Sequence, residues 1–346
     1  MTGGWVDDDL VMAPTGFGGW CRILLRGGML GALTFGGLAL LLLCRLVERP
    51  VFGPARPITP HITQAVCRAA FRIMGIKLRI QGRPMTQHGA VVANHASWLD
   101  IFALNAAQRV YFVAKSEVAL WAGIGWLARA TGTVFIARKP AEAKLQQGVF
   151  EARLRVGHRL LFFPEGTSTD GLRVLPFKPT LFAAFYAHGL DHGLHIQPAT
   201  VIYHAPDAAD PRFYGWWGRM EFGPHLKMVL AARRHGSVDV ILHDPVPVIE
   251  FANRKTLAAR CEAVIRQAHQ AGPSGGPIRR VHKQAHQAGT AAASGQGGQQ
   301  GAQGGDRVFA GPDLVTDAEE IGDRRKRRDQ TGIKTALGDD GHLDHL

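Results

Sequence analysis

The stretch VVANHASWLDIFALNAAQ, residues 91–108, joins an apolar run, a polar turn and a segment of helical length. The apolar run ends at Asn94 and indicates a buried strand, and the residues from Trp98 onward are numerous enough for a helix. The same order recurs up to about residue 250. Further apolar runs that are bounded in this way are VYFVAK, TVFIAR, RLLFFPEG, IQPATVIY and VDVILHD. Strands that alternate with helices predict an α/β fold with a mostly parallel central sheet flanked by helices.

His95 and Asp100 follow the first of these strands. On one continuous helix their side chains would point about 140° apart, so they can meet only if a helix begins between them. The sequence SWLD, residues 97–100, has the Ser-x-x-acid form of a capping box and predicts a helix that starts near Ser97. Asp100 then lies within reach of the imidazole as the partner of a catalytic base. The simpler alternative is that Asp100 only caps the helix and His95 is an ordinary turn residue.

Polar residues also follow two other predicted strands. LLFFPEGTSTDG, residues 160–171, ends in a glycine-containing turn whose backbone N–H groups suit an anionic or polar ligand. TVFIARK brings Arg138 and Lys139 to the end of another strand, where a cationic pair can bind a carboxylate or a phosphate. An ordinary surface turn and two solvated cations are the alternatives.

The amino-terminal region contains a long apolar segment. Residues 27–44 carry no charge and would form a helix of about 27 Å, close to the thickness of a membrane. We expect a short segment at 1–26 and a membrane helix at 27–46, with a buried core helix as the alternative. Basic residues are more numerous after the segment than before it, which places the main domain in the cytoplasm.

Residues 47–82 are expected to hold an amphipathic helix and a first strand. Five apolar residues at helical spacing, Ile62, Val66, Ala70, Ile73 and Met74, precede Gly75, a natural helix end. This helix lies either on lipid headgroups or against the domain. The alternating segment IKLRIQG, residues 76–82, then predicts a half-buried strand.

The rest of the sequence narrows the functional classes. The chain has 40 Lys and Arg against 28 Asp and Glu, so an anionic surface is the expected partner. The basic residues are dispersed, which argues against nucleic acid. The four cysteines form no C-x-x-C pair, and the usual NTPase, dinucleotide, lipase and zinc-protease motifs are absent.

Residues 271–346 are rich in Gly, Gln and Ala and end in a charged segment, so we expect a disordered tail after a catalytic domain at 83–270.

The motifs NHASWLD, TVFIARK, FPEGTST and IQPATVIY, in this order, resemble the four sequence blocks of the glycerolipid acyltransferase family, which includes the 1-acyl-glycerol-3-phosphate acyltransferases. The span 112–139 is also similar, with Lys115 at the usual lysine position. The resemblance covers roughly residues 80–250 and favours the catalytic interpretation of His95 and Asp100.

This resemblance implies transfer of an acyl group from a thioester of acyl carrier protein or coenzyme A to the hydroxyl of a lysolipid, at the cytoplasmic face of a bacterial inner membrane. His95 would act as the general base and Asp100 would orient and stabilise its imidazole. No metal or other cofactor is expected. The implied substrate-binding residues are Asn94, Lys115, Arg138, Glu165, Gly166, Thr167 and Asp170.

The acceptor is where the sequence departs from the common family pattern. Members that act on phosphate-bearing acceptors typically have arginine after EGT, whereas this chain has Ser168. Lyso-ornithine lipid acyltransferases look similar in this region and in the segment FYGWWGRMEFGPHL, residues 213–226. The resemblance therefore favours lyso-ornithine lipid, with its ammonium held by Asp170 or Glu165 and its carboxylate by Arg138. The alternative for Asp170 is that it only stabilises its turn. Lysophosphatidate is the alternative acceptor, and a non-catalytic membrane-binding protein is the third hypothesis.

Overall fold

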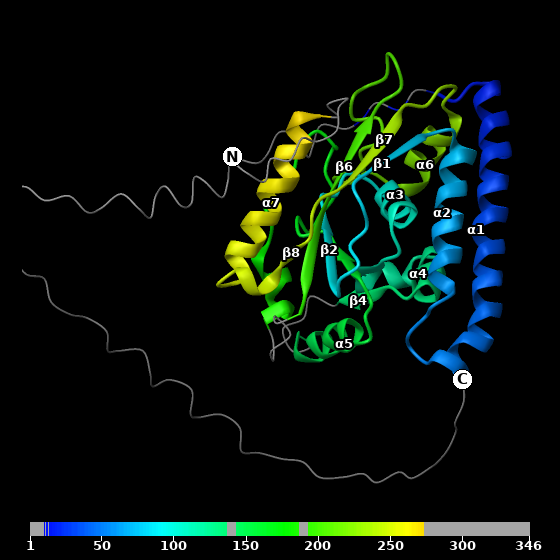
Figure 1. Ribbon diagram of the computed structural model, residues 1–346. Coiled ribbons are helices and arrows are strands. Elements are labelled where there is room, and N and C mark those ends of the chain that lie inside the picture. The colour runs from blue at the N-terminus through cyan, green and yellow to red at the C-terminus, as the bar shows by residue number, and fades with distance from the viewer. Residues whose placement is uncertain (1–9, 11, 13, 137–142, 187–192, 273–346) are drawn as a thin grey trace, which may run out of the picture. The chain divides into compact units, whose positions relative to one another are not determined.

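The computed structural model describes residues 10, 12, 14–136, 143–186 and 193–272 (Figure 1). Its strands are β1 (Lys77–Gln81), β2 (Gly89–Ala93), β3 (Tyr111–Lys115), β4 (Val134–Ile136), β5 (Leu160–Phe162), β6 (His195–His204), β7 (Ser237–Leu242) and β8 (Val246–Pro247). Its α-helices are α1 (Phe17–Phe52), α2 (Thr59–Met74), α3 (Leu99–Ala107), α4 (Ile124–Thr131), α5 (Ala143–Arg155), α6 (Phe222–Ala231) and α7 (Arg254–Ala271). Short 3₁₀ helices cover Ser116–Leu120, Pro179–Tyr186 and Val248–Glu250.

The strands form one sheet in the order β1-β7-β6-β2-β5-β3-β4, with β8 paired to β6. The pairs of β6 with β7 and with β8 are antiparallel, and the other neighbours are parallel. The predicted mostly parallel sheet is therefore confirmed, and β1 to β7 each overlap a predicted strand segment, with β2, β6 and β7 extending one or two residues beyond theirs. Only the two-residue strand β8 was not expected.

Helices cover both faces of the sheet because successive strand residues point to opposite sides. In β2, Val91 and Ala93 belong to a core cluster with residues of α2, α3 and α6. Ala90 and Val92 belong to a second cluster with residues of α5 and α7. A strand buried on both faces has no polar positions, which explains why the segment is uniformly apolar.

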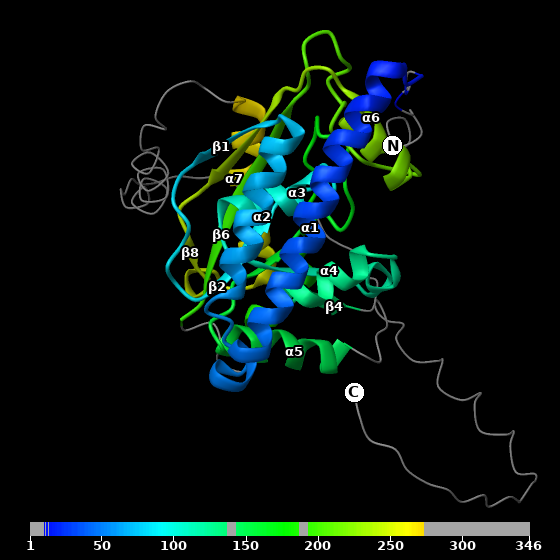
Figure 2. The ribbon, with the colours of Figure 1, turned by 90° about the vertical axis from the view of Figure 1, so that its right-hand side faces the viewer.

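Helix α1 extends beyond the predicted membrane helix at both ends. It spans 36 residues, of which 27–46 form the middle. One side docks on the domain: Arg22 donates a hydrogen bond to the Ala231 carbonyl at 2.7 Å, and Arg26 donates to Leu230 at 3.0 Å and to Ala232. Gly37 packs so closely on Val66 of α2 that an added Cβ would lie 2.5 Å from it. Figure 2 shows α1 and α2 side by side, with α6 near one end of α1, α4 beside its middle and α5 near the other end.

Helix α2 packs on the domain, which was one of the two expected positions for it. Its residues Cys67, Ala70, Phe71 and Met74 are buried in the first core cluster. The helix ends at Gly75, which has φ +79°, in the left-handed region where glycine is favoured. The tail predicted from residue 271 starts at Ala271, the last residue of α7, and from residue 273 onward it lies outside the described residues.

Candidate active site

The polar turn after β2 is held by the neighbouring strand β6. Asn94 is buried, and its side-chain amide donates to the Val201 carbonyl at 2.9 Å and accepts from the Val201 N–H at 2.8 Å. These two bonds continue the parallel pairing beyond the last residue of β2. The Asn94 side chain is therefore occupied by the backbone of β6, which gives it a role in fixing the turn and leaves no geometric support for the predicted substrate contact.

The predicted contact between His95 and Asp100 is present. His95 Nδ1 lies 2.7 Å from Asp100 Oδ2, and that oxygen also accepts hydrogen bonds from the N–H groups of Ala96 at 2.8 Å and Ser97 at 3.0 Å. Helix α3 begins at Leu99, two residues after the predicted start at Ser97. The carboxylate draws the backbone of residues 96 and 97 into a tight turn, so the helix cannot begin until that turn is complete.

A second strand supplies a partner that sequence analysis missed. Tyr203 of β6 donates its hydroxyl hydrogen to Asp100 Oδ1 at 2.7 Å, so both oxygens of the fully buried carboxylate are bound. Burial, and then the negative charge of Asp100, raise the pKa of Tyr203 well above its usual value, which keeps the phenol protonated as a donor. Tyr203 ends the quoted motif IQPATVIY, but its link to Asp100 depends on β6 lying beside β2.

We expect Tyr203→Phe to lower kcat by about tenfold, because a hydrogen bond to a charged group contributes roughly 1.5–3 kcal/mol and phenylalanine retains the ring. The acceptor KM should stay close to that of the wild type, since Tyr203 acts on Asp100 and not on substrate. Steady-state kinetics on the purified protein measures both constants. A kcat within twofold of wild type, or a loss confined to KM, would contradict this positioning role.

The imidazole of His95 is oriented on a second side by an aromatic ring. Phe163 stacks on it with a centroid distance of 3.9 Å and an interplanar angle of 9°. The His95 side chain is 19% exposed, and within the described part of the chain Nε2 has no hydrogen-bond partner. When Nδ1 carries the hydrogen that Asp100 accepts, the lone pair of the neutral imidazole is on Nε2. The geometry agrees with the predicted roles of His95 as a general base and Asp100 as its orienting carboxylate.

The Pro-Glu-Gly bend lies directly beside His95. Glu165 accepts the His95 N–H on Oε1 at 2.7 Å and the Leu175 N–H on Oε2 at 2.6 Å, and the Thr169 N–H donates to the His95 carbonyl at 2.9 Å. Glu165 is buried, and burial raises its pKa to about 8 in spite of these bonds. Each oxygen of this buried carboxyl already accepts a backbone N–H group, so the geometry supports a role of Glu165 in fixing the turn that carries His95 over the predicted ammonium contact.

The raised pKa of Glu165 makes folding stability depend on pH. Between its ordinary pKa of 4.5 and about 8, the folded protein retains a proton on Glu165 that the unfolded chain releases, so the contribution of Glu165 to stability is fully present below pH 4.5 and is lost as the pH rises through about 8. We expect this fall, on the order of a few kcal/mol, to be absent from Glu165→Gln. Urea unfolding of both proteins in detergent at pH 5.5 and pH 8.5 measures it. Buried histidines act in the opposite direction but are common to both proteins, so an equal pH response in the two would contradict the prediction.

Asp170 stabilises its own turn, which was the alternative expected for it. Its carboxylate is buried, accepts the Leu172 N–H at 3.1 Å and pairs with the Arg173 guanidinium at 2.8 Å. An ammonium would have to compete with Arg173 for the same oxygens. The geometry therefore supports the structural interpretation of Asp170 over the predicted ammonium contact.

The other predicted substrate residues lie at strand ends near this edge or outside the described residues. Lys115 is exposed at the carboxyl end of β3. Gly166 has φ +75°, which allows the sharp bend after Glu165, and Thr167 beside it is exposed. Arg138 lies outside the described residues. No group of three or more potential metal ligands occurs among residues whose placement the structure describes.

The tryptophan-rich segment 213–226 packs against the turn that carries His95. The backbone N–H of Trp216 donates to the Ala96 carbonyl at 2.8 Å. Gly215 lies so close to Asp170 that an added Cβ would be 2.5 Å from the Asp170 carbonyl oxygen. Trp98 donates its indole N–H to His225 at 2.8 Å. The segment thus supports both the histidine turn and the Pro-Glu-Gly turn from one side.

Comparisons with known proteins agree with this geometry. An acyltransferase family model matches residues 77–202. A lyso-ornithine lipid O-acyltransferase from Rhodobacter capsulatus is 59% identical over 253 residues, which cover 73% of this chain and 92% of that protein. A protein of the same name from Pseudomonas aeruginosa is 32% identical over 250 residues, covering 71% and 93% of the two chains.

A solved structure confirms the fold. The crystal structure of the 1-acyl-sn-glycerophosphate acyltransferase PlsC from Thermotoga maritima has a TM-score of 0.55 to this chain at 20% sequence identity. The match covers 73% of this chain and 95% of that one. At this identity the similarity bears on the fold alone, and it confirms the architecture that the sequence motifs implied.

Proposed function

The chain belongs to the acyltransferase family, and on this premise we propose that it transfers a fatty acyl group from a thioester to the hydroxyl of lyso-ornithine lipid. The chemical part of the proposal depends on one observation, the 2.7 Å contact between His95 Nδ1 and Asp100 Oδ2. Because Asp100 accepts the hydrogen on Nδ1, the lone pair of the imidazole is on Nε2. The His95 side chain is 19% exposed, so a substrate hydroxyl can reach it.

The reaction follows from this arrangement. A hydroxyl is a weak nucleophile at neutral pH, so Nε2 of His95 removes its proton as the oxygen attacks the thioester carbonyl. Asp100 stabilises the imidazolium that forms, while Tyr203 and the N–H groups of Ala96 and Ser97 hold the carboxylate in place. The tetrahedral intermediate then expels the thiolate, which takes the proton from Nε2. The products are an ester and a free thiol, and His95 is again neutral.

Lyso-ornithine lipid is favoured as the acceptor by the 59% identity to the Rhodobacter capsulatus relative that bears this name. Ser168 stands where phosphate-acceptor members of the family typically have arginine, and a lost guanidinium weakens recognition of a phosphate dianion. Because Glu165 and Asp170 are bound to backbone N–H groups and to Arg173, we propose that neither carboxylate is the main site for the ornithine ammonium. Lysophosphatidate is the second candidate acceptor.

A paired assay tests the acceptor. The purified full chain is supplied with lyso-ornithine lipid or lysophosphatidate, each with the same acyl chain, and with acyl carrier protein or coenzyme A thioesters as donors. We expect kcat/KM to be higher for lyso-ornithine lipid with at least one donor. Efficient use of lysophosphatidate alone would overturn the acceptor assignment and leave the acyl transfer itself standing.

We further propose that α1 attaches the enzyme to the cytoplasmic surface of the inner membrane by lying along one leaflet. The helix is long and apolar enough to cross a membrane, but its 36 residues correspond to about 54 Å, well beyond a hydrocarbon core of roughly 30 Å. Its bonds from Arg22 and Arg26 to the end of α6 hold it against the domain. A tag at the amino terminus should therefore be accessible from the same side of sealed vesicles as the catalytic domain.

A further inference from the structure

A wide hollow of about 1040 Å³ lies at the carboxyl-terminal end of α1. Five arginines from separate parts of the chain line it: Arg45 and Arg49 of α1, Arg56 of the following loop, Arg129 of α4 and Arg153 of α5. The rest of the lining includes a stripe of leucines on α1 and the exposed Trp126. One part of the hollow is therefore strongly cationic and another is apolar.

The positive charge in this hollow is poorly compensated. Glu48, just outside the lining, pairs with Arg45 at 3.1 Å and is itself buried, with its oxygens bound to residues 58 and 59. None of the other four arginines has an ion pair in the described ranges of the chain. Arg56 donates to the Ala130 carbonyl at 2.7 Å, and Arg153 donates to the Gly132 carbonyl at 2.8 Å. A guanidinium has five N–H groups, so several donors remain for a ligand.

The arginines also repel one another at partly buried positions. The pKa of Arg56 is lowered by burial and then by Arg45, and the pKa of Arg153 is lowered by burial and then by Arg56. His158, which accepts a hydrogen bond from Arg153 at 2.6 Å, has its pKa lowered to about 4 by burial and by these arginines, and is neutral. Because nearby like charges disfavour one another, an anion bound among these arginines would be stabilising.

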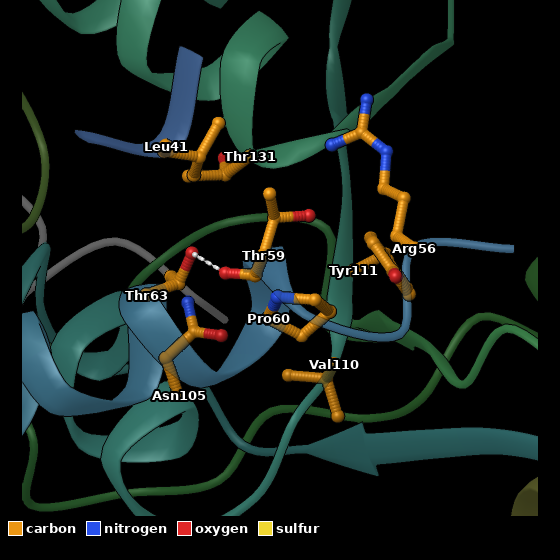
Figure 3. A pocket seen from close by; sticks show the side chains of 9 residues that line it. All are labelled: Leu41, Arg56, Thr59, Pro60, Thr63, Asn105, Val110, Tyr111 and Thr131. Atoms are coloured by element: carbon orange, nitrogen blue, oxygen red, sulfur yellow. Dashed lines mark hydrogen bonds between the residues drawn. The ribbon is translucent and has the colours of Figure 1, made fainter. Parts of the chain in front are cut away.

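The arginine hollow is separate from the catalytic centre. Arg153 lies over the ring of Tyr111, the first residue of β3, and His158 precedes β5. The hollow is therefore at the amino ends of these strands, whereas His95 follows the carboxyl end of β2, which runs parallel to β5. Figure 3 shows the small cavity on the inner side of Arg56, where Thr59, Thr63 and Asn105 lie, with the Arg56 guanidinium extending away from them.

We propose that this hollow binds an anionic phospholipid of the membrane, with the phosphate against the arginines and the acyl chains along the α1 leucines and Trp126. A guanidinium group can donate two parallel hydrogen bonds to the oxygens of one phosphate. Tryptophan is favoured where lipid headgroups meet acyl chains. The leucines that line the hollow, Leu38, Leu42 and Leu46, lie on α1, the helix proposed to lie along the leaflet. The bound lipid is neither acyl donor nor acceptor; it anchors the enzyme and neutralises the arginines.

The test compares two pairs of charge-removing substitutions in the full chain. Arg49→Gln with Arg129→Gln alters exposed arginines of the hollow, and Arg254→Gln with Arg260→Gln alters exposed arginines of α7, a helix that contributes no residue to its lining. Binding is measured to vesicles of phosphatidylcholine with and without phosphatidylglycerol. We expect the first pair to lower the preference for phosphatidylglycerol by about fivefold per arginine and the second pair to lower it by less than twofold. Equal losses in both pairs would show a general charge effect and overturn the proposal.

A second measurement separates a lipid from a free anion. In zwitterionic detergent, phosphatidylglycerol should raise the thermal unfolding temperature of the wild type and not that of the Arg49 and Arg129 variant, and inorganic phosphate should have little effect. A rise with phosphate as large as that with the lipid would overturn the lipid assignment. An unchanged response in the variant would show that these arginines only stabilise helix ends, and would also overturn it. Turnover in the same detergent should be equal in wild type and variant, because neither arginine belongs to the catalytic site.

Discussion

Replacing His95 by alanine should lower kcat by about 10²–10⁴-fold, because no other group takes the proton from the attacking hydroxyl. Its Nδ1 contact with Asp100 at 2.7 Å and the stacked ring of Phe163 orient Nε2 for this step. The measurement is initial-rate kinetics on purified protein, with circular dichroism and vesicle attachment as checks on folding. A variant that retains a tenth or more of the wild-type kcat would reject His95 as the base.

The chain offers a matched control for this substitution. His204 lies 2.7 Å from the buried carboxylate of Asp239, so it forms a second histidine–aspartate pair in the same sheet. Asp239 also binds Arg79, and neither partner belongs to the turn that carries His95. His204→Ala should leave kcat within about twofold of wild type. If both histidine substitutions abolished turnover, loss of local structure would explain the result better than loss of a base.

Asp100→Asn should lower kcat by about 10³–10⁴-fold. In the serine protease triad the equivalent change has an effect of about 10⁴, because an amide can hold the imidazole in the wrong tautomer. Here the amide nitrogen would also face one of the donors that now bind the carboxylate, from Ala96 and Ser97 on one oxygen or from Tyr203 on the other. We therefore expect an additional loss of roughly 1–3 kcal/mol in the free energy of unfolding.

A double substitution separates the two effects of Asp100→Asn. His95 and Asp100 act as one unit, so the protein with both His95→Ala and Asp100→Asn should be no slower than His95→Ala alone. Asp239→Asn, which alters another fully buried carboxylate, should lower stability and leave the kcat of the folded protein unchanged. If the loss of kcat in the double variant equalled the product of the two single losses, a shared proton-transfer step would be contradicted.

Local sequence determined most of the elements of this protein. Each strand from β1 to β7 is an apolar or alternating run bounded by turn residues, and such patterns depend only on neighbours along the chain. The local sequence showed that His95 could meet Asp100 across a turn and a helix start, but it left open that Asp100 only caps the helix; the family resemblance favoured the contact that is observed. The helix start itself was predicted two residues early, since the same carboxylate that pairs with His95 also holds the turn.

Tertiary structure alone decided what the remaining polar groups do. Tyr203 reaches Asp100 because β6 pairs beside β2, and Glu165 binds the His95 backbone because β5 pairs on the other side of β2. Five arginines between residues 45 and 153 line one hollow because the helices and the loop that carry them pack together in the folded chain. The pattern of apolar residues predicts which side chains face inward. The order of the strands, however, is set by packing among distant segments. The partners of a buried polar group can therefore be identified only in the folded chain.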